Sequence, residues 1–446
     1  MRRLLVGLLM CWSIQIQAQE KSKRFDVKPA VHWRTFWMST TYPEDFKSDY
    51  SLGTSLSLGA KMTLGPNWSA QVSYRGFWNV FSSDIWTYDP LANRRNRYET
   101  GLYDLVHPGK DAFGSWENLN VQYSDAKWSV ALGRMEANST WINPQDGRLS
   151  PTFFEGAKAS WKPDRSWELS AMYVHRFRIR GTKDWFRPGE TLGIFPTGRD
   201  SYGQPSQYYS HTSSDRVTVL EAGKKTGGGD LSFSQTWADN LFVTYWGQWV
   251  KSWEHKSQMT WSGGVQLGYQ HGMGDGGNPD SLLRYKNPED QNWVISARIG
   301  MKTKKVEAQL NLTKLGGNGR WLSPREWGRD AWFTFISRER NEGYQSVEAL
   351  TTYLAFSPDD AWSFYVHSGV HFLPDLSDAA ANKYAFPSYR QVNLGVKHQF
   401  KKIKGLDFHL LVMNKEALGE ESLSPVQRYN KVEMIQVNGI LNWKIN

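Results

Sequence analysis

The sequence has almost no cysteine and no long apolar segment, and each absence removes a class of protein. Its one cysteine, Cys11, allows neither a disulfide framework nor a cluster of thiolate metal ligands. Because no run of 18 apolar residues occurs, the chain cannot form a bundle of membrane helices. The motifs of zinc proteases, serine hydrolases and phosphate-binding loops are missing, and the 10 histidines show no metal-ligand spacing. We therefore expect no metal, no cofactor and no catalytic site.

Aromatic residues are abundant instead. The 446 residues include 23 Trp, 20 Tyr and 21 Phe beside 39 Gly, whereas a disordered chain is poor in aromatic side chains. The formal net charge is +9, a modest excess that favours contact with anionic solutes or lipid head groups. These numbers indicate a folded, Trp-rich chain, most simply an all-β one.

The first residues have the pattern of a secretory signal peptide. A positive segment, Met1–Arg3, precedes a short apolar segment, Leu4–Ile14, and Ala18 supplies a small residue for cleavage. The apolar segment is too short to span a membrane as a helix. We therefore predict a signal peptide over residues 1–18 and a mature, exported chain over residues 19–446.

Beyond this segment, apolar and polar residues alternate over long stretches. Along residues 52–64 nearly every second residue is apolar, which predicts a β-strand with one apolar and one polar face. Counting such runs gives eighteen strands, with sixteen as the alternative because the faces are less regular over residues 217–269. The runs begin near Val31, Leu52, Trp68, Trp116, Trp128, Phe153, Trp167, Val217, Leu231, Leu241, Met259, Trp293, Val306, Val347, Trp362, Arg390, Leu406 and Val432.

The connections between these runs alternate between short and long. Short turns such as Gly65–Asn67 and Thr303–Lys305 alternate with long segments such as Asn79–Gly114 and Leu315–Tyr344, and an extended stretch at Ala331–Ser337 falls inside the last of these. Aromatic residues open several strands just after a short turn. These features are typical of an outer-membrane β-barrel, whose strands close on one another because hydrocarbon offers the backbone no water.

The predicted fold class is therefore all-β, a transmembrane antiparallel β-barrel with short periplasmic turns and long extracellular loops. The alternative is a secreted soluble propeller or sandwich, for instance a glycan-active enzyme, but strands there average only about five or six residues. A barrel of about 16 to 18 strands encloses a lumen that side chains do not fill, which indicates a conduit. An outer-membrane barrel enzyme, active at the rim, is the less favoured function.

Alternation also assigns side chains to the lumen. In the run 167–180, Arg176, Arg178 and Arg180 fall on the lumen face and form a column of guanidinium groups. Such a pore-lining column offers successive bidentate sites for a carboxylate or a phosphate. The alternation is broken at residues 174–175, and the alternative is that Arg178 and Arg180 lie beyond the membrane and bind lipid phosphates or water.

Other charged residues of the predicted strands also point inward. The further inward basic residues are Arg75, Lys158 and Arg298. A possible opposing acidic wall consists of Glu168, Glu307 and Asp407. We expect these charges, together with the width of the lumen, to set the selectivity of the pore.

The loop after the fifth predicted strand carries the motif of a known family. Its residues are Leu132-Gly133-Arg134, Asn143-Pro144, Asp146, Arg148-Leu149, Pro151, Phe154 and Gly156. The stretch resembles the OprD family of substrate-specific outer-membrane porins, and Lys404-Gly405-Leu406 is similar to a late turn of that family. The resemblance implies an eighteen-strand barrel narrowed by an inward-folded loop at about residues 135–152 and by the seventh loop, with a basic ladder along one wall.

The resemblance also implies roles for single residues. Asp146 and Arg148 match the constriction loop, and Arg176, Arg178 and Arg180 match the basic ladder. The family takes up small, commonly carboxylate-bearing solutes by passive diffusion. The alternative for Asp146 and Arg148 is that they only hold the loop against the barrel wall.

The sequence thus predicts a porin, a passive and substrate-selective channel for small anionic or carboxylate-bearing solutes in the outer membrane of a Gram-negative bacterium. A saccharide-selective porin is the alternative, because the loop residues Trp141, Trp185 and Trp321 are free to stack on sugar rings. An occluded, purely structural barrel is the third possibility. The expected partners are small-molecule solutes, outer-membrane lipids and the barrel assembly machinery, not nucleic acid, and the chain is a monomer or a trimer.

Overall fold

The structure is a computed structural model of the whole chain. It describes residues 25–43, 46–145, 148–255, 258–419 and 422–445. The predicted signal peptide over residues 1–18 and the predicted constriction residue Asp146 lie outside the described residues.

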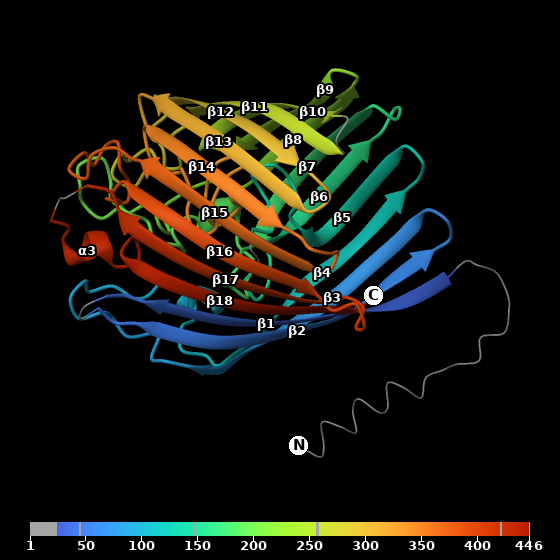
Figure 1. The fold of residues 1–446 in the computed structure, drawn as a ribbon, viewed down its shortest axis with the longest axis horizontal. Helices are drawn as coiled ribbons and strands as arrows, with labels where there is room; N and C mark the ends of the chain where they lie inside the picture. The colour runs from blue at the N-terminus through green and yellow to red at the C-terminus, as the bar shows by residue number, and fades with distance from the viewer. Residues whose placement is uncertain (1–24, 44–45, 146–147, 256–257, 420–421, 446) are drawn as a thin grey trace, which may run out of the picture.

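Eighteen antiparallel strands form one closed sheet (Figure 1). Each strand pairs with its neighbours in sequence, and β1 also pairs with β18, which closes the barrel. The prediction of an all-β barrel with eighteen strands is confirmed, and the alternative of sixteen strands is wrong. The strands are β1 Phe25–Thr41, β2 Asp49–Leu64, β3 Trp68–Ser82, β4 Ala112–Ser124, β5 Trp128–Glu136, β6 Phe153–Trp161, β7 Trp167–Arg178, β8 Val217–Thr226, β9 Gly229–Ala238, β10 Phe242–His255, β11 Met259–Gly272, β12 Gln291–Lys302, β13 Val306–Gly317, β14 Val347–Phe356, β15 Trp362–Phe372, β16 Tyr389–Gln399, β17 Leu406–Ala417 and β18 Met434–Ile445.

The two faces of the strands differ as the alternation predicts. On β2, Ser55 is fully buried and Ser57 is 5% exposed, whereas Leu58 is 56% exposed. The apolar side chains of the outer face are not covered by other parts of the protein, as expected for a barrel wall that faces hydrocarbon. Trp68 and Trp128, each of which opens a strand after a short turn, are also exposed.

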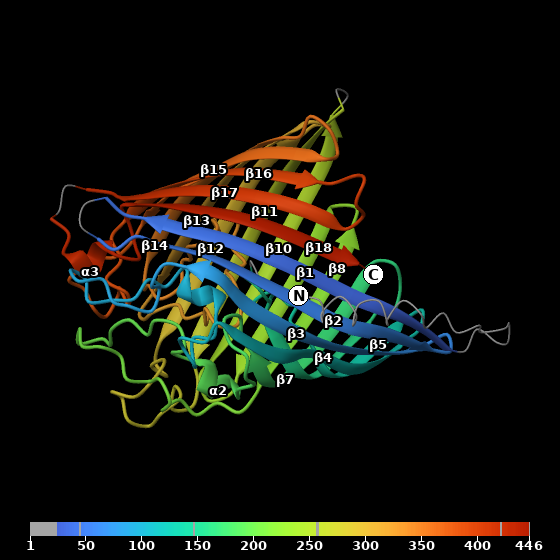
Figure 2. The same ribbon diagram turned by 90° about the horizontal axis from the view of Figure 1, so that it is seen from below.

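Short turns gather at one end of the barrel and longer connections at the other (Figure 2). The connection between β9 and β10, residues 239–241, is an exception, because it is short and lies at the long-loop end. The extended stretch Ala331–Ser337 belongs to the β13–β14 loop and forms no strand, as predicted. The described helices are one turn long: η1 Thr100–Leu102, α2 Pro188–Thr191 and α3 Pro425–Arg428. Among the described residues, no helix has the length and apolar character needed to cross a membrane.

Two glycines of the OprD-like motif allow β5 and its neighbours to approach closely. Gly133 has φ +113°, and a Cβ atom there would lie 2.2 Å from the carbonyl oxygen of Leu119 on β4. Its partner in the β5–β6 register is Gly156, where a Cβ would lie 1.9 Å from the carbonyl oxygen of Tyr173 on β7. A side chain at either position would therefore push neighbouring strands apart.

The β13–β14 loop, residues 318–346, lies inside the barrel. Polar side chains of the inner wall bind its backbone: Gln270 of β11 donates to the carbonyl of Leu322, and Gln391 of β16 donates to that of Ser337. Trp327 of the loop stacks on Phe177 of β7 at 5.2 Å between ring centroids. The loop therefore spans the lumen and divides it into separate cavities.

Candidate functional site

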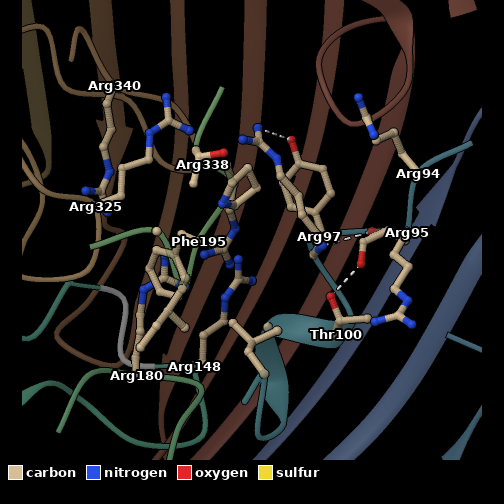
Figure 3. Close-up of a pocket in the computed structure, with 18 of the residues that line it drawn as sticks. Arg94, Arg95, Arg97, Thr100, Arg148, Arg180, Phe195, Arg325, Arg338 and Arg340 are labelled. Atoms are coloured by element: carbon tan, nitrogen blue, oxygen red, sulfur yellow. Dashed lines mark hydrogen bonds between the residues drawn. The ribbon is translucent and has the colours of Figure 1, made fainter. Parts of the chain in front are cut away.

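A cavity of about 640 Å³, here called the upper cavity, lies at the long-loop end and is lined only by loop residues. The lining comes from four loops: β3–β4, β5–β6, β7–β8 and β13–β14. None of the residues that the structure describes lines it with a carboxylate side chain. The lining includes nine arginines: Arg94, Arg95, Arg97, Arg148, Arg180, Arg325, Arg329, Arg338 and Arg340. Figure 3 labels all of them except Arg329.

The β3–β4 loop is fixed over the cavity by side-chain hydrogen bonds. Asp89 accepts hydrogen bonds from the backbone NH groups of Leu91 and Ala92 and so shapes the turn before the arginines. Asn430 of the β17–β18 loop accepts a hydrogen bond from the NH of Arg97 at 3.0 Å and donates one to the carbonyl of Arg95 at 2.7 Å. These bonds hold the arginine-bearing segment at a defined place over the lumen.

A buried glutamate joins three elements beneath this segment. Glu339 of the β13–β14 loop pairs with Arg97 of the β3–β4 loop at 2.6 Å and with Lys415 of β17. Burial alone would raise the pKa of Glu339, but Lys415, Arg97 and Arg325 outweigh it and lower that pKa to about 2. The carboxylate therefore stays charged and ties both loops to the wall.

The inner part of the cavity is crowded with positive charge. The side-chain oxygen of Gln145 accepts hydrogen bonds from Arg180 at 2.6 Å and from Arg340 at 2.7 Å. The Arg180 guanidinium also lies 4.7 Å from the centre of the Phe195 ring. Burial, followed by the charges of Arg148 and Arg340, lowers the pKa of Arg180 below its usual range. An anion placed here would relieve this repulsion.

A second cavity, of about 830 Å³ and here called the lower cavity, lies toward the short-turn end. Its lining includes Lys302, Lys304 and Asp407, which belong to strands and turns at that end. Ser337 and Arg338 line both cavities and separate them. A solute that crosses the barrel through these cavities would pass Arg338.

Sequence comparisons find no relative, since neither a protein-family model nor a curated protein matches the chain. Solved structures match it closely in shape. OccK9 (OpdG) of Pseudomonas aeruginosa has a TM-score of 0.73 at 12% identity, covering 94% of this chain and 98% of that one. For OccAB3 of Acinetobacter baumannii the TM-score is 0.72 at 12% identity, covering 94% and 100%. OpdK of P. aeruginosa, solved with vanillate, has a TM-score of 0.70 at 12% identity, covering 94% and 98%.

The chain has the fold of the OprD-family porins. The resemblance predicted from the loop motif is thus confirmed for the fold. These neighbours are outer-membrane channels and not enzymes.

Within this OprD fold, the predicted arginine column does not form a single row. The β6–β7 register shifts between Glu155 and Gly156, and the shift leaves His175 without a partner in the ladder, which explains the broken alternation there. β7 ends at Arg178, so Arg180 lies in the β7–β8 loop, where it lines the upper cavity. Arg176 pairs with Glu155 in the register and does not line that cavity.

Arg178 is occupied by protein groups. It is fully buried and pairs with Glu117 of β4 at 3.2 Å, while it donates to Ser150 and to the carbonyl of Pro151 in the β5–β6 loop. Glu117 also pairs with the predicted inward residue Arg75 of β3 at 2.7 Å. This network holds the β5–β6 loop against the wall, and a solute has no access to Arg178 in this conformation.

The remaining predicted basic residues lie apart from the upper cavity. Lys158 of β6 donates to the carbonyl of Asn138 at 3.0 Å. Arg298 of β12 donates to Asn311 at 2.6 Å and lies 4.3 Å from the ring centre of Phe333 in the β13–β14 loop. Both residues therefore bind loops that fill the lumen.

The residues of the predicted acidic wall do not gather at one place. Glu168 of β7 is exposed and pairs with Lys162 at 3.3 Å, and Glu307 of β13 pairs with Lys302 at 3.3 Å. Asp407 of β17 lines the lower cavity. None of the three lines the upper cavity.

Arg148 holds its loop against the barrel wall and also lines the upper cavity. Its carbonyl oxygen accepts a hydrogen bond from Arg34 of β1, which attaches the β5–β6 loop to the wall. Its side chain lines the upper cavity and reaches the sulfur of Met38 at 3.4 Å. The companion residue of the motif, Asp146, lies outside the described residues.

The loop tryptophans considered for sugar stacking are engaged elsewhere. Trp141 and Trp321 are buried and pack with Trp332, with ring centres 5.3 to 5.7 Å apart. Trp185 lies over the guanidinium of Arg134 at 4.6 Å. None of these tryptophans lines the upper cavity, so they give no support to saccharide selectivity.

One group of described residues has ligand types and spacing suited to a metal ion. Ligand atoms of Asp104, His107 and Asp184 lie within 4.8 Å of one another. His107 lies 3.0 Å from Asp104, and Lys183 lies 3.8 Å from the same carboxylate. Lys183 already supplies a positive charge there, so the group serves as an ion-pair cluster between the β3–β4 and β7–β8 loops.

Most cavity arginines were not anticipated from the sequence. Alternation assigns faces only within strands, whereas Arg97, Arg325, Arg338 and Arg340 belong to loops. A usable signal was the clustering of arginine in two long connections, over residues 94–97 and 325–340.

Proposed function

We propose that the protein is a passive diffusion channel of a Gram-negative outer membrane that admits small anionic solutes, carboxylates foremost. The observation that carries this proposal is the upper cavity, whose lining holds nine arginines and, among the described residues, no carboxylate side chain. Guanidinium groups bind carboxylates in bidentate fashion, and a positive lining raises the local concentration of anions. The vanillate of the OpdK structure is such a carboxylate.

Uncompensated charge supports the preference for anions. Arg97 and Arg325 have glutamate partners behind the cavity wall, Glu339 and Glu342. Arg180, in contrast, forms no ion pair within the described part of the chain and is held only by Gln145 and the Phe195 ring. We propose that Arg180 and Arg148 contact the solute, whereas Arg178 and Arg75 fix the wall.

The cellular setting completes the proposal. Residues 1–18 direct export as a signal peptide, and the barrel assembly machinery inserts the mature chain beside outer-membrane lipids. Transport needs no cofactor and no energy source, because solutes move down their gradients through the cavities. Single barrels and trimers both suit this function.

Current through the refolded protein in a planar lipid bilayer under a KCl gradient tests the proposal. We expect discrete steps with an anion-selective reversal potential. Arg180→Gln should lower the anion preference, while Arg284→Gln, which removes a loop arginine outside the cavity lining, should leave it unchanged. Folded protein that gives no steps would refute the channel, and steps without anion preference would refute the selectivity.

A further inference from the structure

Five of the nine arginines that line the upper cavity form two groups that differ in burial. Arg94 and Arg95, here called the outer pair, belong to the β3–β4 loop and are exposed. Arg148, Arg180 and Arg340, here called the inner group, come from three other loops and are buried or half-buried. Figure 3 shows the outer pair on one side of the cavity and the inner group on the other.

The outer pair is free to receive an anion. The Arg95 guanidinium lies 4.8 Å from the centre of the Tyr88 ring, and neither arginine forms an ion pair in the described part of the chain. The nearby carboxylate of Asp89 is already occupied, because it accepts hydrogen bonds from backbone NH groups of its own loop and of Lys47.

The inner group shares one neutral acceptor. Gln145 receives hydrogen bonds from both Arg180 and Arg340 through a single oxygen atom. Two described acids whose charges act on this group are engaged with the backbone: Glu326 accepts from the NH groups at positions 193 and 195, and Asp330 accepts from the NH of Asn341. Arg180 and Arg340 therefore have no ion-pair partner in the described part of the chain.

The lining of the cavity also has a neutral, largely apolar part. It includes Ile194, Phe195 and Pro196 of the β7–β8 loop. The cavity volume of about 640 Å³ is within the range that holds small organic molecules. A short solute with a neutral middle would therefore fit between two separate anion sites.

We propose that this cavity selects solutes with an anionic group at each end, one bound by the outer pair and the other by Arg180 and Arg340. The inference rests on the proposed function, because it names the solute class of the same site. The anionic groups are carboxylates or phosphates, since guanidinium recognises both in the same geometry. A solute with one anionic group occupies only one of the two sites.

Calorimetric titration of the detergent-solubilised protein measures this binding without requiring conduction. The carboxylate probes are adipate and its monomethyl ester, which have similar length but two charges and one. We expect adipate to bind roughly tenfold more tightly, because it gains a second set of charged hydrogen bonds. Fructose 1,6-bisphosphate against fructose 6-phosphate gives the matching phosphate pair, and the larger ratio identifies the preferred anion.

Variants separate the two sites. The double variant R94Q/R95Q should weaken adipate binding roughly tenfold while the monomethyl ester, which the inner group binds, is unchanged. Arg180→Gln should weaken both ligands, and Arg284→Gln should weaken neither. Equal affinity of the two ligands in both probe pairs, or an equal loss of adipate and ester binding in R94Q/R95Q, would overturn the inference.

The outcome is distinguishable from failure of the channel proposal. If the bilayer current is anion-selective but the two ligands of each probe pair bind equally, the channel stands and the two-site inference fails. If adipate binds preferentially but folded protein carries no current, the two sites stand and passive transport fails.

Discussion

Two buried glutamates of the loops show how the surroundings of a single carboxyl group decide its charge. Glu339 is surrounded by Lys415, Arg97 and Arg325, which lower its pKa to about 2 although burial acts in the opposite direction. Glu99, whose acceptor Oε1 receives one hydrogen bond from Thr40, has a pKa that burial raises to about 8. At neutral pH the first residue is therefore an anion, and the second mostly keeps its proton.

The raised pKa of Glu99 predicts a pH dependence of the β3–β4 loop. Unfolded, this carboxyl loses its proton near its ordinary pKa of 4.5, whereas in the folded loop it keeps the proton up to about 8. Between these values the unfolded state binds fewer protons, so each pH unit upward should destabilise the folded loop by about 1.4 kcal/mol. Hydrogen exchange of the loop amides, corrected for intrinsic rates, measures this opening free energy at pH 5, 6.5 and 8.

Glu99→Gln removes the titrating group but keeps an acceptor for Thr40. In this variant the opening free energy should be independent of pH over the same range. A wild-type loop that is equally protected at pH 5 and pH 8 would contradict the prediction.

At the scale of the elements, the strands could be predicted far better than the loops. A barrel wall with lipid on its outer side requires an apolar residue at every second position of each strand. The number of strands and the approximate positions where they start could therefore be predicted from the sequence. The alternation did not assign side chains correctly to the inner and outer faces near His175, where the register of the β6–β7 pair shifts. Loop positions depend on contacts between distant segments, such as Arg97 with Glu339, and no local period encodes such contacts.

The ion pairs of Glu339 predict that this residue anchors the β13–β14 loop to the barrel wall. Glu339→Gln would leave the buried Lys415 and the half-buried Arg97 without a carboxylate, which should destabilise the docked loop by about 3 kcal/mol. We expect noisier single-channel current and faster tryptic cleavage within the loop. Glu416→Gln is a suitable control, since that residue follows Lys415 on β17 and forms an exposed ion pair with Arg390. Equal cleavage rates in both variants would exclude the anchoring role.

The position of Arg338 between the two cavities predicts that solutes meet the narrowest part of the lumen at this side chain. Its guanidinium donates to Asn438 of β18 at 3.0 Å and lies 5.8 Å from the Phe36 ring, between the two cavities. Arg338→Ala should join the cavities and raise single-channel conductance on the order of twofold, because pore width and lining charge govern passage. Arg329 belongs to the same loop and lines only the upper of these two cavities. Arg329→Ala, which also removes one positive charge, should therefore change selectivity more than conductance. Unchanged conductance in Arg338→Ala would place the constriction elsewhere.

At the scale of the whole molecule, basic residues accompany the entire path through the barrel. The upper cavity is lined by arginines, Arg338 separates the cavities, and the lower cavity includes Lys302, Lys304, Lys305 and Lys397. The lower lining also contains Asp359, Asp360 and Asp407, so the positive excess is greatest at the long-loop end. Under the proposed function, a solute anion would be attracted most strongly at the mouth and released where opposite charges balance more closely.

This distribution predicts that selectivity depends on ionic strength. The screening length is about 10 Å at 0.1 M salt and about 3 Å at 1 M, so exposed arginines such as Arg94 and Arg95 should lose most of their long-range influence at high salt. The buried inner group is screened less, because water and ions reach it poorly. Reversal potentials at a fixed tenfold KCl gradient, measured around mean concentrations from 0.1 M to 1 M, should therefore show an anion preference that falls but does not vanish. In R94Q/R95Q the preference should start lower and change less with salt, since two of the exposed cavity arginines are removed. A wild-type preference that is independent of salt would assign selectivity to the inner group alone.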